Sequence, residues 1–309
     1  MTIIYSIVQI IVILAIAPLS VGLMRKFKAR MQNRVGASVF QPYRSLFVLC
    51  RKEMTVTRHA SWVFRAVPYV VVACALILAA LVPTVFSGGV SLVWGNFFLI
   101  ASVLMIAAGA LVLGGMDVAS AFGGMGSSRE MTIATLTEPV IVLVFVALGA
   151  MTGSWTAGGA VSIMTENPWY LAHPFLVFVF AALAMVVLAE GARYPVDNPA
   201  THLELTMVHE AMVLEYSGPY LAMLEYAASL KFIVLGVFLA NLVFPFGMWG
   251  AGSGFLLGMA AFAVKIIIVC FLVALLESTV AKMRFYRLQE YFVSAYLLVF
   301  FGLLLSIIF

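Results

Sequence analysis

Charged residues are scarce in this sequence, and their scarcity sets the class of protein. Asp, Glu, Lys and Arg make up 10% of the 309 residues, whereas 64% are apolar and the mean hydropathy is +1.14. Soluble domains carry roughly 25% charged residues. Stretches without any charged side chain cover residues 1–24, 66–116, 139–165 and 232–264. Because about 20 apolar residues cross a bilayer, these stretches predict an integral membrane protein.

Cysteine is also scarce. Cys50, Cys74 and Cys270 form no C-x-x-C pair, which excludes a disulfide framework and a thiolate metal site. The N-terminus has neither the basic start nor the small-residue cleavage site of a signal peptide. The first apolar segment is therefore expected to be retained as a helix.

Two segments lack the pattern that a ligand site would need. "GGMGSSRE" at 123–130 has no Gly-Lys-Ser/Thr ending and no preceding strand, so it is not a P-loop, and its glycines predict close helix packing or a bend. "HLELTMVHE" separates His202 from His209 by seven residues and is not an H-E-x-x-H motif. We expect no metal site, no catalytic residue and no nucleic-acid partner.

Turn residues divide the apolar sequence into helices. "SGG" at 87–89 and "FGMWGAGSG" at 246–254 are two of these breaks. The pattern predicts an all-α fold, a polytopic integral membrane protein with a single membrane domain over 1–309. We expect eight tilted transmembrane helices, at about 3–24, 64–86, 91–115, 131–152, 169–190, 219–245, 255–277 and 289–309.

The basic residues predict the orientation of these helices. Fifteen of the 17 Lys and Arg residues fall on one side, nine of them in the loop over 25–63 (the first loop) and a tenth, Arg65, just after it, and the opposite loops hold none. The positive-inside rule places the basic side in the cytoplasm. Both termini are then outside, and the segment 191–218 (the acidic loop) is cytoplasmic.

The first loop contains an amphipathic pattern. In "PYRSLFVLCRKE", Tyr43, Leu46, Phe47 and Cys50 recur at helical spacing, and Arg44 lies on another face. The pattern predicts a cytoplasmic amphipathic helix at the membrane surface. It would serve either as a lipid anchor or as a docking surface for a soluble partner.

Carboxylates and lysines at membrane depth are costly, which makes them candidates for a proton path or for paired structural charges. The acidic loop adds four carboxylates and the imidazoles of His202 and His209, which should titrate as a group. We interpret the set as a hydrated proton path, with paired charges that fix helix packing as the alternative. Its members are Asp117, Glu138, Glu190, Asp197, Glu204, Glu210, Glu215, Glu225, Lys231 and Lys265.

Three ordered motifs resemble those of one family. "NRVGASVFQPYRSLFVLCRKE" resembles the first-loop motif NRxGPxxxQPxxDxxKxxxKE of the membrane subunit that forms the quinone cavity of respiratory complex I. "GGMDVASAFGGMGSSREMTIATLTEP" resembles the membrane subunits of group 4 [NiFe] hydrogenases and formate hydrogenlyases. "YPVDNPATHLELTMVHEAMVLEYSG" resembles the family's acidic loop, from its PxD opening to its EYSG close. The resemblance covers nearly the whole chain.

The resemblance implies a fold, a set of partners and a docking face. Family members are wedges of eight tilted helices beneath a peripheral redox arm. They carry no redox centre and adjoin antiporter-like membrane subunits in the cell inner membrane. The partners would be a large subunit with the nickel–iron centre and a small subunit with iron–sulfur clusters. The motif matches and the cytoplasmic loops give the cavity and docking residues Arg34, Gln41, Arg51, Lys52, Glu53, Arg129 and Glu130.

Departures from the motif separate the branches of the family. Ser45 and Val48 stand where the complex I motif has Asp and Lys, and Ala37 replaces its Pro. These changes favour a membrane-anchor and proton-path subunit of a hydrogenase or formate hydrogenlyase-type complex. The alternatives are the quinone-cavity subunit of a complex I, for which quinone is the ligand, and a free-standing ion or solute transporter.

Overall fold

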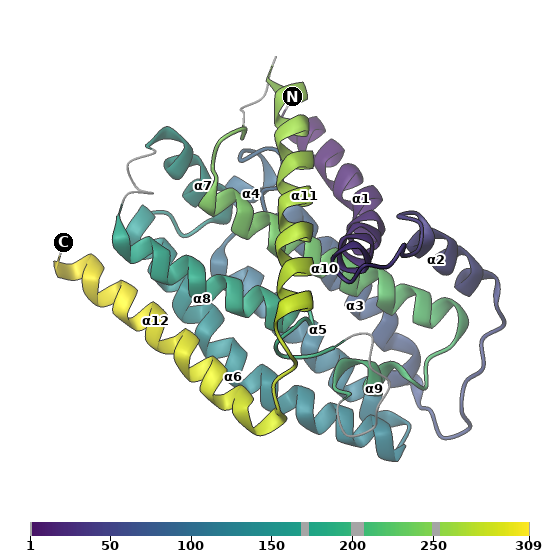
Figure 1. The fold of residues 1–309 in the computed structure, drawn as a ribbon. Coiled ribbons are helices and arrows are strands. Elements are labelled where there is room, and N and C mark those ends of the chain that lie inside the picture. The colour runs from purple at the N-terminus through teal and green to yellow at the C-terminus, as the bar shows by residue number, and fades with distance from the viewer. Residues whose placement is uncertain (1, 168–172, 199–206, 249–253, 309) are drawn as a thin grey trace.

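The computed structural model describes residues 2–167, 173–198, 207–248 and 254–308, and Figure 1 shows its helices. Over these residues the chain is helical and has no strand, with one isolated bridge between Asn96 and Thr156. The prediction of an all-α, polytopic membrane fold is confirmed.

Seven of the described helices are long and apolar enough to cross a membrane. The remaining predicted span, 169–190, contains α8 (Pro174–Glu190). This apolar helix has 17 residues and is shorter than the other seven. At 1.5 Å per residue α8 is about 26 Å long, so a count of eight spans stays a prediction. The seven long helices are α1 (Thr2–Met31), α3 (Trp62–Leu81), α5 (Phe97–Asp117), α6 (Ala121–Thr152), α10 (Gly218–Val243), α11 (Phe255–Thr279) and α12 (Leu288–Ile308).

Shorter helices lie in the connections. The predicted amphipathic helix of the first loop is confirmed as α2 (Gln41–Arg51), with Pro42 in its first turn. Proline suits that position because the first N–H groups of a helix have no partner within it. The others are α4 (Val90–Val93), α7 (Ala157–Glu166), α9 (His209–Val213) and the 3-10 turn η2 (Phe285–Arg287).

The start of α6 differs from the sequence prediction. The helix begins ten residues before the predicted residue 131, and the Ser120 side chain caps it by accepting a hydrogen bond from the Gly123 N–H at 3.1 Å. The glycine-rich stretch is therefore helical. A Cβ added to Gly126 would lie 2.8 Å from the Cβ of Ala211, so this glycine lets α9 pack directly on α6. The expectation of close helix packing is confirmed here.

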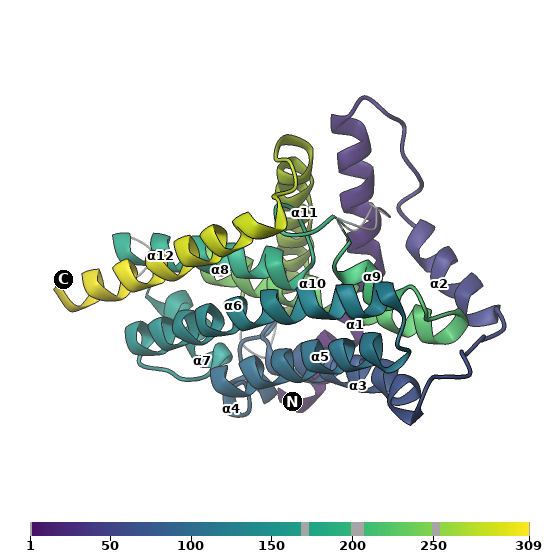
Figure 2. The same cartoon turned by 90° about the horizontal axis from the view of Figure 1, so that it is seen from below.

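α10 is the central helix of the bundle. It packs against α1, α3, α8 and α11, and most of its apolar stretch is buried. Seen from below in Figure 2, α5, α6 and α12 lie alongside one another, and α11 stands across them close to α1. This arrangement leaves a space beside α10, between α1, α2 and α3, that contains the candidate site.

Candidate functional site

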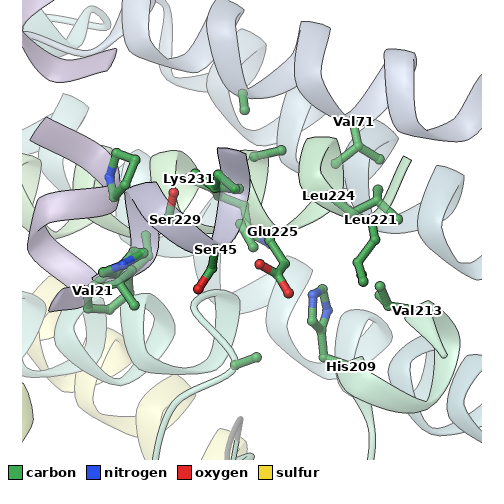
Figure 3. A pocket seen from close by; sticks show the side chains of 18 of the residues that line it. Val21, Ser45, Val71, His209, Val213, Leu221, Leu224, Glu225, Ser229 and Lys231 are labelled. Atoms are coloured by element: carbon green, nitrogen blue, oxygen red, sulfur yellow. The ribbon is translucent and has the colours of Figure 1, made fainter. Parts of the chain in front are cut away.

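A cavity of about 540 Å³ opens beside α10. Pro18 and Val21 of α1, Val71 and Leu78 of α3 and Leu224 of α10 give it apolar walls. α2 along its length and the residues that follow α8 close two other sides. Figure 3 shows side chains from these elements facing a common space. Its volume lies in the range of ligand pockets, about 300–1,000 Å³.

Four predicted proton-path residues line this cavity together. They come from three separate elements, which the fold brings to one place: Glu190 ends α8, Glu210 lies in α9, and Glu225 and Lys231 lie in α10. The Lys231 ammonium donates a hydrogen bond to Glu190 Oε2 at 3.1 Å, and both side chains are mostly buried. The two buried charges therefore compensate each other.

His209 faces the same cavity, on the side of Glu225 in Figure 3. Burial, together with the nearby Lys231 ammonium, lowers the pKa of its imidazole to about 4, although the Asp197 charge acts in the opposite direction. Imidazole is therefore neutral near pH 7 and can accept or donate a hydrogen bond. Sequence reasoning placed His209 in the titrating group of the acidic loop and tested it as a metal ligand, whereas its place in one cavity with residues of α10 depends on the fold.

α2 supplies the cavity wall that the family motif makes recognisable. Gln41, Ser45, Val48 and Lys52 line the cavity, so both departures from the complex I motif, Ser45 and Val48, lie in its wall. The Tyr43 hydroxyl donates to the Ala15 carbonyl of α1 and holds the helix in place. The predicted apolar face of α2 is only partly covered by the rest of the protein, since Phe47 and Cys50 are exposed.

Asp197 is buried at the start of the acidic loop, outside the cavity. Its carboxylate accepts hydrogen bonds from Lys282 Nζ at 2.5 Å, from the His209 backbone N–H at 3.1 Å and from the Asn198 N–H at 2.8 Å. It thereby joins the acidic loop to the segment between α11 and α12. The geometry gives Asp197 a positioning contact with α9.

Glu277 at the end of α11 forms a second ionic cluster. It accepts from Lys28 Nζ of α1 at 3.1 Å and from Arg193 Nη1 of the acidic loop at 3.2 Å. The ammonium of Lys28 also lies 5.0 Å above the Tyr194 ring. Burial raises the pKa of the Tyr194 hydroxyl, and the Glu277 charge adds to this shift. Glu277 is not among the predicted proton-path or docking residues, because its partners come from segments far apart in the sequence.

Three further predicted proton-path residues lie elsewhere. Glu138 borders a separate space of about 10 Å³ that also touches Glu190, roughly the volume of one water molecule. Asp117 accepts from the Ser61 N–H at 2.7 Å and from its hydroxyl at 2.6 Å, at the start of α3. Lys265 is buried in α11 and donates to Asn241 at 2.9 Å.

The remaining predicted docking and proton-path residues lie in or near the first loop and the acidic loop. Arg129 donates to the Met207 carbonyl at 2.9 Å, and Glu130 follows it in α6. Arg34, Arg51 and Glu53 are exposed and lie outside the cavity lining. Glu215 is half-buried. Glu204 and His202 lie outside the described residues.

No group of three or more His, Cys, Asp or Glu that could hold a metal ion occurs among the described residues. The site instead combines a cavity, a mostly buried ion pair, a neutral imidazole and further carboxylates. Such groups can exchange protons when water reaches them. These features define a multi-pass helical membrane protein with a charged cavity between its first helices and its acidic loop.

The family follows from comparison with known proteins. Residues 4–308 match the NADH dehydrogenase family, and the chain belongs to it. It is similar to formate hydrogenlyase subunit 4 of Escherichia coli K12, with 29% identity over 92% of each chain. Hydrogenase-4 component C of the same organism is 28% identical over 92% of this chain and 89% of that protein.

The chain is also similar to a relative from a second group and, in its fold, to a solved structure. An NADH-quinone oxidoreductase subunit of Syntrophotalea carbinolica is 27% identical, over 90% of this chain and 86% of that protein. A chain of the membrane-bound sulfane sulfur reductase, an archaeal respiratory membrane complex, superposes with a TM-score of 0.83 at 17% identity, covering 97% of this chain and 98% of that chain. At that identity the superposition shows the shared fold.

Proposed function

We propose that the chain is the membrane-anchor and proton-path subunit of a membrane-bound [NiFe] hydrogenase complex of the formate hydrogenlyase type. One observation carries the proposal: the fold gathers Glu190, Glu210, Glu225 and Lys231 in one cavity beneath the first loop. The similarity to formate hydrogenlyase subunit 4 and to hydrogenase-4 component C supports this branch of the family.

The proton path begins in the cavity. Glu225 and Glu210 exchange protons with water at its walls, and the Lys231–Glu190 pair holds charge at its inner end. Glu190 also borders the small space beside Glu138, which gives the path a step from α8 to α6. Asp117, Asp197, Glu204, Glu215 and Lys265 are the remaining members of the proposed path.

The first loop and the acidic loop form the docking face. The exposed cations Arg34 and Arg51 and the cavity-lining residues Gln41 and Lys52 would contact the peripheral arm, with Glu53, Arg129 and Glu130 beside them. The partners are a hydrogenase-like large subunit, an iron–sulfur small subunit and antiporter-like membrane subunits. The redox cofactors belong to those partners. The complex lies in the cell inner membrane with both termini of this chain outside.

A quinone-cavity subunit of complex I is the second candidate. The cavity's volume and its apolar walls favour it. Ser45 and Val48 oppose it, because they occupy cavity-wall positions where the complex I motif has Asp and Lys.

Purification of the complex through a tag on this chain separates the two candidates. Nickel and hydrogen-dependent dye reduction in the purified complex are the expected result. A flavin-containing complex that reduces quinone and lacks nickel would overturn the hydrogenase assignment and establish the second candidate.

A further inference from the structure

A group of buried polar side chains lies outside the cavity lining, between the last turns of α10 and the first half of α11. Lys265 of α11 is 7% exposed. It lies 12 residues before Glu277, which at 1.5 Å per residue places it about 18 Å along the helix from the ionic clusters of the acidic loop. In the part of the chain that the structure describes, no carboxylate lies within ion-pair distance of its ammonium. Its hydrogen-bond acceptor there is Asn241 Oδ1, at 2.9 Å.

Asn241 connects this ammonium to the non-helical segment Pro83–Phe86. Its side-chain amide donates to the carbonyl oxygens of Pro83 and Thr84, each at 3.0 Å, and the residue is fully buried. Gln9 of α1 approaches the same segment and accepts a hydrogen bond from the Phe86 N–H at 3.2 Å. Side chains of two helices therefore hold this segment, and one of them also binds Lys265.

Two polar atoms of this group have no protein partner among the described residues. They are Gln9 Nε2 and Thr84 Oγ1, and both residues are essentially inaccessible. An ammonium has three donor hydrogens, and the described contacts of Lys265 use one. Buried donors without an acceptor are rare in folded proteins because each has lost its bonds to water.

The hydrogen-bonding capacity of these unsatisfied groups limits the kind of partner that they can bind. Gln9 Nε2 and the Lys265 ammonium can only donate, so the partner must accept. Water accepts these bonds and can donate its own hydrogens to carbonyl oxygens of the Pro83–Phe86 segment, each of which has two lone pairs. Buried water typically makes about three such bonds. Water also solvates a buried charge that lacks a counter-ion.

We infer that Lys265, Asn241, Thr84 and Gln9 form a buried water-binding site at the end of the bundle opposite α9. Its water molecules complete the hydrogen bonds of the Lys265 ammonium, of Gln9 Nε2 and of the Thr84 hydroxyl. The site keeps a lysine at membrane depth without a carboxylate. This inference is independent of the proposed function, since it follows from contacts within this chain.

A map of the purified complex that resolves ordered water tests the site directly. The expected result is density within about 3 Å of Lys265 Nζ, Gln9 Nε2 and Thr84 Oγ1. Protein groups that satisfy all three atoms without such density would overturn the inference. Density that is replaced by bromide when the buffer anion is exchanged would also overturn it, because it would show an anion site.

The Thr84→Val variant gives a second test, because the sign of its effect differs between a hydrated and a dry hydroxyl. Valine keeps the shape and removes the hydroxyl. If water binds the hydroxyl, Thr84→Val lowers the melting temperature of the complex by about 2 °C or more. If the hydroxyl is unsatisfied, its removal leaves the melting temperature unchanged or raises it, which would contradict the inference.

Thr137→Val is the matched control. Thr137 is also buried, and its hydroxyl donates to the Ile133 carbonyl of its own helix at 2.8 Å. A larger loss of stability in Thr84→Val than in Thr137→Val supports the water site. An equal or smaller loss counts against it.

Discussion

Lys231 and Glu190 join the middle of α10 to the end of α8 across 3.1 Å, and both side chains line the cavity. Their side-chain exposures of 14% and 10% show that the pair is mostly removed from solvent. A buried charge that loses its partner is strongly destabilising, whereas replacement of both partners by apolar groups is often neutral. The pair therefore links the stability of the bundle to the charge state of the cavity.

The first prediction concerns this ion pair. Lys231→Met leaves Glu190 without its counter-ion and should lower the free energy of unfolding by up to about 3–5 kcal/mol. The double variant Lys231→Met/Glu190→Leu should regain much of that loss. Thermal unfolding of the purified complex measures both. Additive effects in the double variant would show that the two side chains do not interact.

The second prediction concerns pH and His209. Its pKa falls from about 6.5 in the unfolded chain to about 4 in the folded protein, because burial and Lys231 disfavour the charged imidazole. The unfolded chain then binds more protons between these two values. The stability that the neutral imidazole provides is present in full above about pH 6.5, declines as pH falls, and is lost near pH 4. The loss is on the order of 3 kcal/mol for a shift of this size.

The His209→Asn variant isolates this contribution. Asn cannot titrate, so its complex should lose less stability than the wild type between pH 6.5 and pH 4. The measurement is the difference between the two stability profiles, because other acidic groups titrate in both proteins. Parallel profiles would mean that His209 is protonated in the folded protein at the same pH as in the unfolded chain.

Local patterns predicted much of the fold. The spacing of Tyr43 and Leu46 correctly gave α2, since amphipathic periodicity is a property of one short segment. The start of α6 was missed because Gly123 and Gly126 resemble a break, and only their contacts with Gly115 and α9 explain why the helix continues.

The site was harder to predict than the helices. Its acids were identified because charge at membrane depth is costly whatever its partner. The pairing of Glu190 with Lys231 was not predicted, since the two residues are 41 positions apart in the chain and meet through the packing of α8 on α10. Gln9 and Asn241 were not identified because they carry no charge, although a carboxamide inside an apolar helix also requires partners.

The third prediction tests the docking face. Arg51 stacks on the Phe47 ring at 4.1 Å, and Lys52 lines the cavity, so both hold positive charge on the exposed side of α2. Arg51→Glu with Lys52→Glu should release the soluble arm from washed membranes, and more so at high salt, because screening weakens the remaining contacts.

The control for this experiment is Arg30→Glu with Arg58→Glu. It makes the same change in charge at two other exposed positions of the first loop. Retention of the arm in this control and its loss in the first variant would assign docking to α2. Retention in both at high salt would leave α2 as a lipid anchor.

The fourth prediction tests the orientation. Val35 lies in the first loop and Val93 in α4, near the N-terminus of α1, and they are 80% and 69% exposed. With Cys50 replaced by Ser, a cysteine at residue 93 should react with an impermeant thiol reagent outside intact cells. A cysteine at residue 35 should react only after the cells are opened. The reverse pattern would place both termini in the cytoplasm.

The fifth prediction separates a proton path from structural pairing. Glu225 is exposed to the cavity and forms no ion pair among the described contacts, so Glu225→Gln should leave the complex assembled. Hydrogen oxidation with a soluble dye bypasses the membrane and should also be retained. Proton uptake coupled to turnover in sealed vesicles should fall at least several-fold, because the amide cannot titrate. Glu210→Gln, at the same cavity, should behave in the same way.

Glu166→Gln supplies the control for the amide change itself. Glu166 is exposed at the end of α7, outside the cavity, so its removal should change neither assembly nor coupling. Loss of assembly in Glu225→Gln before any loss of coupling would show a structural charge instead of a proton carrier. Normal assembly with normal coupling in both cavity variants would remove Glu210 and Glu225 from the path and leave the Lys231–Glu190 pair as the charge to test next.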